Sequence, residues 1–202
     1  MTDPLSAFVT LFVVIDPIGL LPIFAALTAG MDRAARRAIA LRACGVAAGL
    51  LALFGLAGEA LLGFVGITMP AFRIAGGILL FLTALDMLFE RRKERREDKA
   101  EQQRADPSVF PLAIPLVAGP GAIATMILLV GQSSEPVHIA SIYGVMLTVI
   151  ALTLLSFLLA APFERLLGRI GIDVVTRLLG MLLAALSVQF VIDGLRGMGA
   201  LP

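Results

Sequence analysis

Six long apolar runs constrain this chain more than any other feature. They cover residues 5–29, 39–62, 70–89, 109–130, 139–161 and 174–195. A helix needs about 20 apolar residues to cross the hydrocarbon core of a bilayer, whereas membrane strands alternate apolar and polar residues over about ten positions. The pattern predicts an all-α membrane protein with six transmembrane helices, in a single transmembrane domain over residues 1–202.

The composition excludes a soluble domain. Hydrophobic residues make up 59% of the chain and charged residues 15%, whereas soluble domains have about half apolar and about a quarter charged residues. The segment 90–107 alone carries 13 charges, so we expect a solvated cytoplasmic loop there. A net charge of +1 gives no basic face of the kind that binds nucleic acid, and the expected partners are membrane lipids and a small-molecule substrate.

The basic residues predict an orientation in the membrane. Of the 16 Lys and Arg residues, 14 lie in or beside the loops that follow the first, third and fifth apolar runs. The two exceptions are Arg73 and Arg196. Because cytoplasmic loops are enriched in Lys and Arg, we expect a multi-pass protein of the inner membrane with both termini outside.

The two halves of the chain resemble each other. Residues 59–67 (EALLGFVGI) and 164–172 (ERLLGRIGI) agree at seven of nine positions, counting Val65 and Ile170 as equivalent. Because each half holds three apolar runs, the second half would enter the membrane from the opposite face. We therefore predict two inverted three-helix repeats, 5–89 and 108–196, an architecture of secondary transporters whose substrate site lies near the membrane midplane. Further matching pairs are Arg73 with Arg177 and Thr83 with Ser187.

The first and fourth runs are predicted to be broken near their middle, because proline removes a backbone donor and disfavours helical conformation in the residue before it. Asp16 followed by Pro17, and Gly119 followed by Pro120, each read as an N-cap and a first helical residue. Each break would open a helix N-terminus inside the membrane, with the two ends close together. The breaking residues are Asp16, Pro17, Gly19 and Pro22 in the first run, and Pro115, Gly119, Pro120 and Gly121 in the fourth.

The two predicted helix ends would suit a small zwitterion. Helix N-termini attract anions, and Gly119 has no side chain, so the amides of Gly121, Ala122 and Ile123 are expected to be free for a carboxylate. An ammonium group would approach Asp16. The candidate substrate-binding residues are Asp16, Pro17, Gly19, Gly119, Pro120, Gly121, Ala122 and Thr125.

Several of these residues have a structural alternative. Asp16 is the only charge in the central part of a run, which marks it as a functional candidate, but it could serve only as a cap. Arg73 and Arg177 are candidates for a gate or an anion contact, or extend to lipid headgroups. Helix-to-helix hydrogen bonds explain polar residues inside the runs equally well, and glycine pairs such as 45 with 49 and 76 with 77 indicate close helix packing.

Three stretches carry a resemblance to a known family. They are FVVIDPIGLLPIF (12–24), FRIAGGILLFLTALDML (72–88) and FPLAIPLVAGPGAI (110–123). On these the chain resembles the MarC family of the LysE-type transporter superfamily, over essentially its whole length. The resemblance implies a bacterial or archaeal inner-membrane protein with six spans and external termini, and transport of small neutral amino acids such as glycine and alanine.

The first functional hypothesis is therefore a secondary transporter of small neutral amino acids. The alternative is a translocase of an anionic polyprenyl-phosphate lipid carrier, in which Arg73 and Arg177 guide the phosphate and an opening to the bilayer lies beside the first and fourth spans. An enzyme is not expected, because the chain has no HExxH or GxSxG motif. No cofactor or metal is expected either, and the single cysteine, Cys44, excludes a zinc site built on several thiolates.

Overall fold

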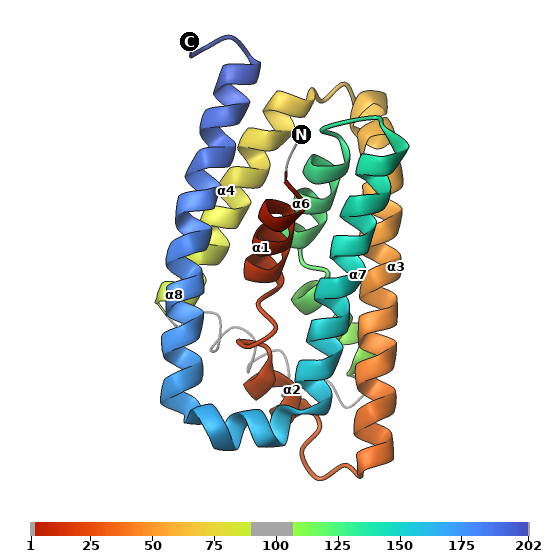
Figure 1. Ribbon diagram of the computed structural model, residues 1–202, viewed down its shortest axis with the longest axis vertical. Helices are drawn as coiled ribbons and strands as arrows, with labels where there is room; N and C mark the ends of the chain where they lie inside the picture. The colour runs from red at the N-terminus through yellow and green to blue at the C-terminus, as the bar shows by residue number, and fades with distance from the viewer. Residues whose placement is uncertain (1–2, 90–106, 202) are drawn as a thin grey trace.

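The computed structural model describes residues 3–89 and 107–201, and within them every regular element is a helix (Figure 1). The side chains of residues 161, 164, 165, 167 and 169 are not part of this description. The predicted charged loop, apart from Pro107, also lies outside the described residues. The all-α class is confirmed. The helices are α1 (Pro4–Ile15), α2 (Leu21–Leu27), α3 (Arg33–Val65), α4 (Met69–Leu88), η1 (Ser108–Val117), α6 (Pro120–Val130), α7 (Pro136–Leu158) and α8 (Ala160–Gly197).

The helices form an upright bundle in which α1 and α6 occupy the centre (Figure 1). Both chain ends lie at the upper end of this view, while the connections from α2 to α3 and from α7 to α8 lie at the lower end. The helix α8 bends near its start at Gly168, whose backbone is non-helical with a positive φ (φ 62°, ψ 175°). Its first part runs across the lower end of the bundle and its longer part rises along one side.

The number of membrane-crossing helices differs from the prediction of six. Four helices among the described residues are long and apolar enough to cross a membrane: α3, α4, α7 and the part of α8 from Ile170 to Gly197. The pair η1 and α6 makes a fifth span if the two helices are counted together. The predicted span over 5–29 is not one of them, because α1 has 12 residues and α2 has 7, and 12 residues rise only about 18 Å.

Glycine allows α4 and α8 to pack side by side in antiparallel fashion. A Cβ atom on Gly194 would lie 2.9 Å from the backbone oxygen of Pro70 near one end of the pair, and one on Gly180 would lie 3.0 Å from the Cβ of Met87 near the other. Gly76 and Gly77, predicted to mark close packing, do so: a Cβ on Gly77 would lie 2.8 Å from the backbone oxygen of Ser187 on α8, and one on Gly76 would lie 3.2 Å from the Leu128 side chain on α6. Backbone contact of this kind is typical of membrane helix pairs.

The same prediction is wrong for Gly45 and Gly49. A Cβ atom added at either position on α3 would meet nothing within 4 Å. Glycine spacing on one helix does not show which face is turned to a neighbour, so a glycine pair alone does not predict close packing.

Aromatic packing fixes the short helix α2 to the lower end of the bundle. The rings of Phe24 on α2 and Phe157 on α7 are stacked, with centroids 4.5 Å apart and planes 6° apart. The guanidinium carbon of Arg36 lies 5.8 Å from the centroid of the Phe24 ring, within the range of a cation–π contact. Both rings are almost fully buried. Side-chain packing therefore attaches α2, the second part of the broken first run, to α7 and α3.

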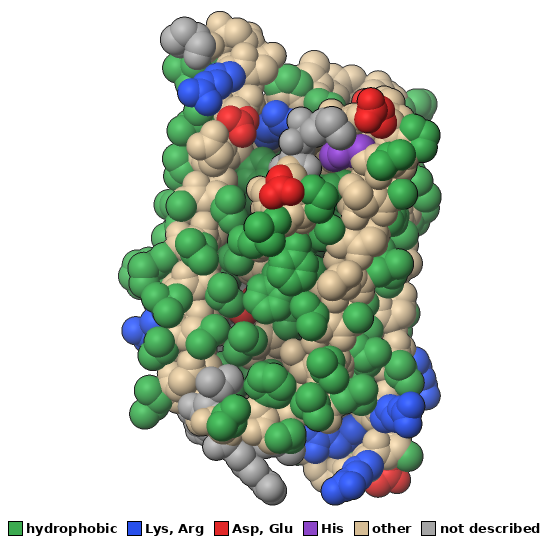
Figure 2. All heavy atoms as spheres, viewed as in Figure 1, with side chains coloured by type: hydrophobic (Ala, Val, Ile, Leu, Met, Phe, Trp, Pro, Cys, Tyr) green, Lys and Arg blue, Asp and Glu red, His purple; other side chains and the backbone are tan. Residues whose placement is uncertain are grey.

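The surface carries an apolar band between two charged ends. Hydrophobic side chains cover most of the middle of the molecule, and most of the Lys and Arg side chains in view gather at the lower end (Figure 2). Large apolar side chains such as Phe64 (90% exposed) and Ile170 (81% exposed) point away from the protein. A soluble protein rarely exposes apolar surface on this scale, so this band is the surface expected to face lipid.

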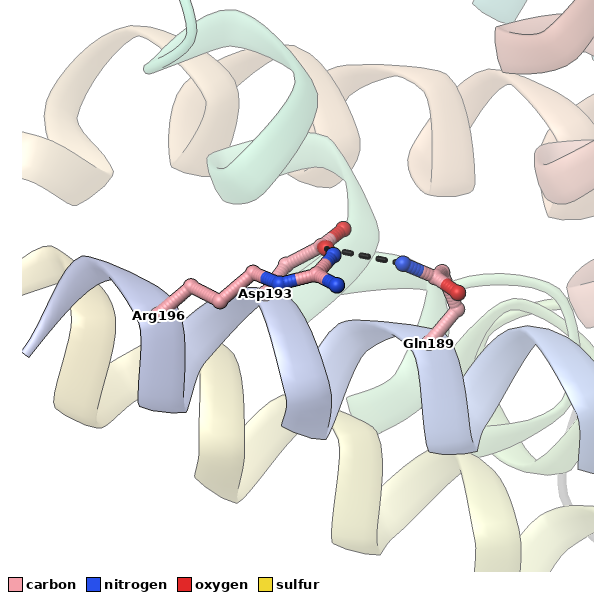
Figure 3. Close-up of polar contacts among 3 residues, drawn as sticks. All are labelled: Gln189, Asp193 and Arg196. Carbon is pink, nitrogen blue, oxygen red and sulfur yellow. Dashed lines mark hydrogen bonds and ion pairs between the residues drawn. The ribbon is translucent and has the colours of Figure 1, made fainter. Parts of the chain in front are cut away.

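Three polar side chains on α8 interact along the helix, and one of them, Gln189, lies inside the predicted span 174–195. The Gln189 amide donates to the Asp193 carboxylate at 2.8 Å, and Arg196 pairs with the same carboxylate at 3.8 Å (Figure 3). All three residues belong to one helix, and the side chains of Asp193 and Arg196 are exposed. The hydrogen bond of Gln189 is therefore made along its own helix and not to a neighbouring helix.

Candidate functional site

The first break lies at Asp16, directly after α1. Asp16 has a left-handed backbone conformation (φ 54°, ψ 65°) and its amide donates to the Phe12 carbonyl at 2.9 Å, so it ends α1. It is the one non-glycine residue with positive φ in the described chain, and its side chain is completely buried. A left-handed conformation of this kind costs about 1–3 kcal/mol and is concentrated at functional sites.

Contrary to the prediction, Asp16 is not the N-cap of the helix that follows it, α2. Its carboxylate accepts a hydrogen bond from the amide of Gly19 at 3.0 Å, the contact expected of an N-cap, but the residues that follow form only a turn. The helix α2 begins at Leu21 and its N-cap, Leu20, offers no side-chain hydrogen bond. The prediction that Pro17 is the first residue of a half-helix is therefore wrong, because Pro22 already occupies the first turn of α2, where proline is tolerated.

The corrected position changes the electrostatics of the first break. Asp16 lies at the C-terminal end of α1, and helix C-termini carry partial negative charge on carbonyls that lack intrahelical donors. In a continuing helix the amides of residues 17 and 19 would donate to the carbonyls of Val13 and Ile15. Pro17 has no N–H, and the Gly19 amide donates to Asp16 instead. Carboxylate and carbonyl oxygens therefore gather at this break, an arrangement that attracts a cation.

The second break follows the prediction closely. Gly119 is the N-cap of α6 with an extended backbone (φ −75°, ψ 167°), Pro120 is the first helical residue, and no side chain caps the helix. The chain bends by 55° between η1 and α6. A Cβ atom on Gly119 would lie 2.6 Å from the backbone oxygen of Pro115, so the bend itself requires glycine at this position. The end of η1 is equally irregular, since Ile114 and Pro115 have non-helical backbone angles.

The amides at the start of α6 are fewer than predicted. The Ile123 amide donates to the Gly119 carbonyl at 3.0 Å, so it belongs to the helix. The amides of Gly121 and Ala122 are in the first turn, where intrahelical acceptors are missing, and both residues are buried. Thr125 is buried one turn further, with its hydroxyl donating to the Gly121 carbonyl at 2.8 Å. Pro120 itself is exposed.

The structure brings the two breaks together. A Cβ atom on Gly121 would lie 3.5 Å from a methyl carbon of Val14, two residues before Asp16, and 3.0 Å from a methyl carbon of Leu80 on α4. The start of α6, with its partial positive charge, therefore packs beside the end of α1, with its carboxylate and carbonyl oxygens. The substrate-binding candidates near the ends, Asp16, Pro17, Gly19, Gly119, Pro120, Gly121 and Ala122, all belong to these two neighbouring segments.

The structure adds one residue that the sequence did not indicate. Thr176 on α8 faces the first break, because a Cβ atom on Gly19 would meet both the Asp16 carboxylate and, at 3.0 Å, the Thr176 hydroxyl. The hydroxyl oxygen of Thr176 is buried and has no hydrogen-bond partner in the described chain. No motif surrounds Thr176, and the neighbouring Arg177 drew attention only as part of the repeat.

Arg73 and Arg177 are not brought together. Arg73 lies one residue before Ile74, which packs on Gly194, whereas Arg177 lies before Gly180, which packs on Met87. The 14 residues from Arg73 to Met87 rise about 21 Å along a helix, so the arginines are near opposite ends of the α4 and α8 pair. Arg73 is half-buried and Arg177 is exposed, and Arg177 interacts with another group of the protein.

A groove of about 280 Å³ lies between α4 and α8. Its lining is apolar apart from Ser187 and includes neither arginine. The lipid-carrier hypothesis predicts an opening beside the first and fourth spans, and this groove lies beside other helices. The lining residues are Gly77, Ile78, Phe81, Leu82, Ser187, Val188, Val191 and Ile192.

Comparisons with known proteins agree with the resemblance seen in the sequence. Residues 1–199 match the MarC family of integral membrane proteins. A UPF0056 membrane protein of Archaeoglobus fulgidus is 40% identical over 94% of this chain and 91% of its own length. The UPF0056 membrane protein YvbG of Bacillus subtilis is 39% identical over 95% of this chain and 93% of its own length. No solved structure matches the chain.

Proposed function

Because this chain belongs to the MarC family of integral membrane proteins, we propose that it is a secondary transporter of small neutral amino acids, with its substrate site where the two broken segments meet. The observation that carries the proposal is the contact between two helix ends of opposite partial charge inside the bundle. The uncapped start of α6 accepts the substrate carboxylate. The Asp16 carboxylate and the end of α1 accept its ammonium group.

The walls of the site favour a small substrate. The residues beside Pro120 at the start of α6 are Ala118, Gly119, Gly121 and Ala122, and Val14 and Leu80 pack against Gly121. These side chains are short or apolar and none carries a charge. Val14, which packs on Gly121, is only two residues before Asp16, so the start of α6 lies near Asp16. A short separation between these two groups suits glycine or alanine better than a long or cationic amino acid.

The proposal includes an inverted repeat. The helices α3 and α7, which hold equivalent places in the two halves, run in opposite directions through the bundle, and so do α4 and α8 (Figure 1). In this scheme α1 with α2 corresponds to η1 with α6, so each half contributes one broken segment. Transporters with this architecture alternate their access by moving one repeat against the other around a fixed central site. The complete burial of Asp16 requires such a movement before substrate can reach it.

Exchange of labelled glycine in proteoliposomes tests the proposal. We expect uptake into vesicles loaded with unlabelled glycine or alanine, and a loss of at least about tenfold in Asp16→Asn, since one charge-assisted hydrogen bond contributes about 1.5–3 kcal/mol. Asp193→Asn is the matched control, because Asp193 is exposed and pairs within its own helix. Its exchange rate should stay within about twofold of the wild type, the effect usual for an exposed pair.

Two results would argue against this function. The first is wild-type exchange no faster than leakage from protein-free vesicles. The second is full exchange in Asp16→Asn. Thermal unfolding of each variant in detergent must accompany the assay, so that a lost activity is attributed to Asp16 only where the variant remains folded.

A further inference from the structure

Thr176 on α8 carries an observation that the proposed function does not use. Its hydroxyl oxygen is buried and has no partner among the described residues, whereas the hydroxyls of the buried residues Thr10, Thr28, Thr125 and Thr153 each donate to the carbonyl four residues earlier. A buried hydroxyl without a hydrogen bond is costly. Thr176 is therefore placed for an interaction that its own helix does not supply.

The surroundings of this hydroxyl are rich in oxygen. It lies close to Gly19, and so does the Asp16 carboxylate, which accepts a hydrogen bond from the Gly19 amide. The carbonyls of Val13 and Ile15 end α1 beside Asp16 without the donors of a continuing helix, because Pro17 has no N–H and the Gly19 amide donates to Asp16. Unwound carbonyls and the C-terminal ends of half-helices coordinate Na⁺ or H⁺ in broken-helix transporters, and carboxylate oxygens are ligands of hard cations too.

We propose that Asp16, Thr176 and the carbonyls at the end of α1 form a binding site for a compact monovalent cation. This inference deepens the proposed function, on which it rests, and gives α8 a direct part in the site. Two cations fit this site: the ammonium group of the amino acid, and Na⁺ bound as a coupling ion. Only one ligand in this set is a carboxylate and the others are neutral oxygens, which suits a monovalent ion better than Ca²⁺, whose sites draw on several carboxylates.

Thermal unfolding of the full-length protein in detergent separates the two sources. One arm compares NaCl with choline chloride, and the other compares glycine with N-acetylglycine, which keeps the carboxylate but has no positive charge. A ligand that binds only the folded protein raises the unfolding temperature by mass action. Stabilisation by NaCl alone identifies a coupling-ion site, and stabilisation by glycine but not N-acetylglycine identifies an ammonium site.

Variants at position 176 decide whether the site is the one described. Thr176→Val keeps the shape of the side chain and removes the hydroxyl. The apparent Kd of the stabilising compound, Na⁺ or glycine, should then rise about tenfold, which corresponds to the loss of one contact of about 1.4 kcal/mol. Thr176→Ser should bind like the wild type, and so should Thr153→Val, whose hydroxyl donates to the Val149 carbonyl at 2.9 Å. Thr176→Ala provides a second variant should the valine variant not fold.

The outcomes separate this inference from the proposed function. Unchanged affinity in Thr176→Val, or no stabilisation of the wild type in either arm, overturns the cation site. If Na⁺ binds with the expected dependence on Thr176 while glycine exchange in vesicles is absent, the cation site stands and the transport of amino acids is rejected. Normal exchange in Thr176→Val with unchanged Na⁺ and glycine affinities rejects the cation site alone.

Discussion

Gly77 on α4 lies against the backbone of Ser187 on α8, so that a Cβ atom at Gly77 would come within 2.8 Å of the Ser187 carbonyl oxygen and 3.1 Å of the Val191 amide nitrogen. Both neighbours are backbone atoms of a long helix, which do not move aside as a flexible side chain does. The spacing of the α4 and α8 pair therefore depends on the absence of a side chain at this position.

Gly77→Ala is expected to destabilise the protein by about 1–3 kcal/mol, the usual effect of overpacking a close contact. Thermal unfolding in detergent measures the change. Gly45→Ala and Gly49→Ala on α3 are matched controls, since a Cβ at either position meets nothing within 4 Å, and alanine there removes backbone freedom from the unfolded chain. Equal destabilisation of all three variants would contradict the contact between α4 and α8.

A second prediction concerns the attachment of α2. Phe157→Ala removes the ring that stacks on Phe24 at 4.5 Å and leaves a cavity in a buried site, so we expect a loss of about 3–5 kcal/mol. The control is Leu158→Ala, because Leu158 is 45% exposed on the same helix. Limited proteolysis should cut the α2 to α3 connection faster in Phe157→Ala than in the control. Equal cleavage rates in the two variants would mean that the stacked rings do not hold α2.

The second break could be predicted from the sequence because its chemistry is local. Gly119 followed by Pro120 combines a residue that accepts an extended backbone without a side chain with one that suits the first helical position, and the structure has both in these roles. The first break was placed correctly but interpreted wrongly. A carboxylate that accepts from the amide three residues later fits both an N-cap and an isolated turn, and only Pro22, which must lie in the first turn of α2, distinguishes the two.

The rest of the site depends on packing that no local pattern encodes. Thr176 lies far from Asp16 along the chain, and it meets the first break only because α8 rises beside the turn that joins α1 to α2 (Figure 1). The contact of Val14 with Gly121 is of the same kind. The repeat predicted that the two breaks would be neighbours, but it did not show which residues touch.

Gly19→Ala provides a third prediction. A Cβ atom at Gly19 would collide with the Asp16 carboxylate, so the acid must leave its place over the Gly19 amide. We expect glycine exchange in proteoliposomes to fall at least about tenfold, because the acid would lose its charge-assisted hydrogen bond. Gly63→Ala on α3, where a Cβ meets nothing within 4 Å, should leave exchange unchanged. Normal exchange in folded Gly19→Ala would show that the position of the Asp16 carboxylate is not needed for transport.

The orientation predicted from the basic loops is tested by cysteine labelling. The chain has one native cysteine, Cys44, and it is buried, so a membrane-impermeant thiol reagent should label the wild type weakly.

Ser134→Cys places an exposed thiol between α6 and α7, at the end of the bundle that holds both termini, and Met31→Cys places one between α2 and α3 at the other end. Because 14 of the 16 Lys and Arg residues lie in or beside the loops that follow the first, third and fifth apolar runs, the first of which contains Met31, and such loops face the cytoplasm, intact cells should be labelled at position 134 and not at position 31. Permeabilised cells should be labelled at both. The reverse pattern in intact cells would place the termini in the cytoplasm and overturn the predicted orientation.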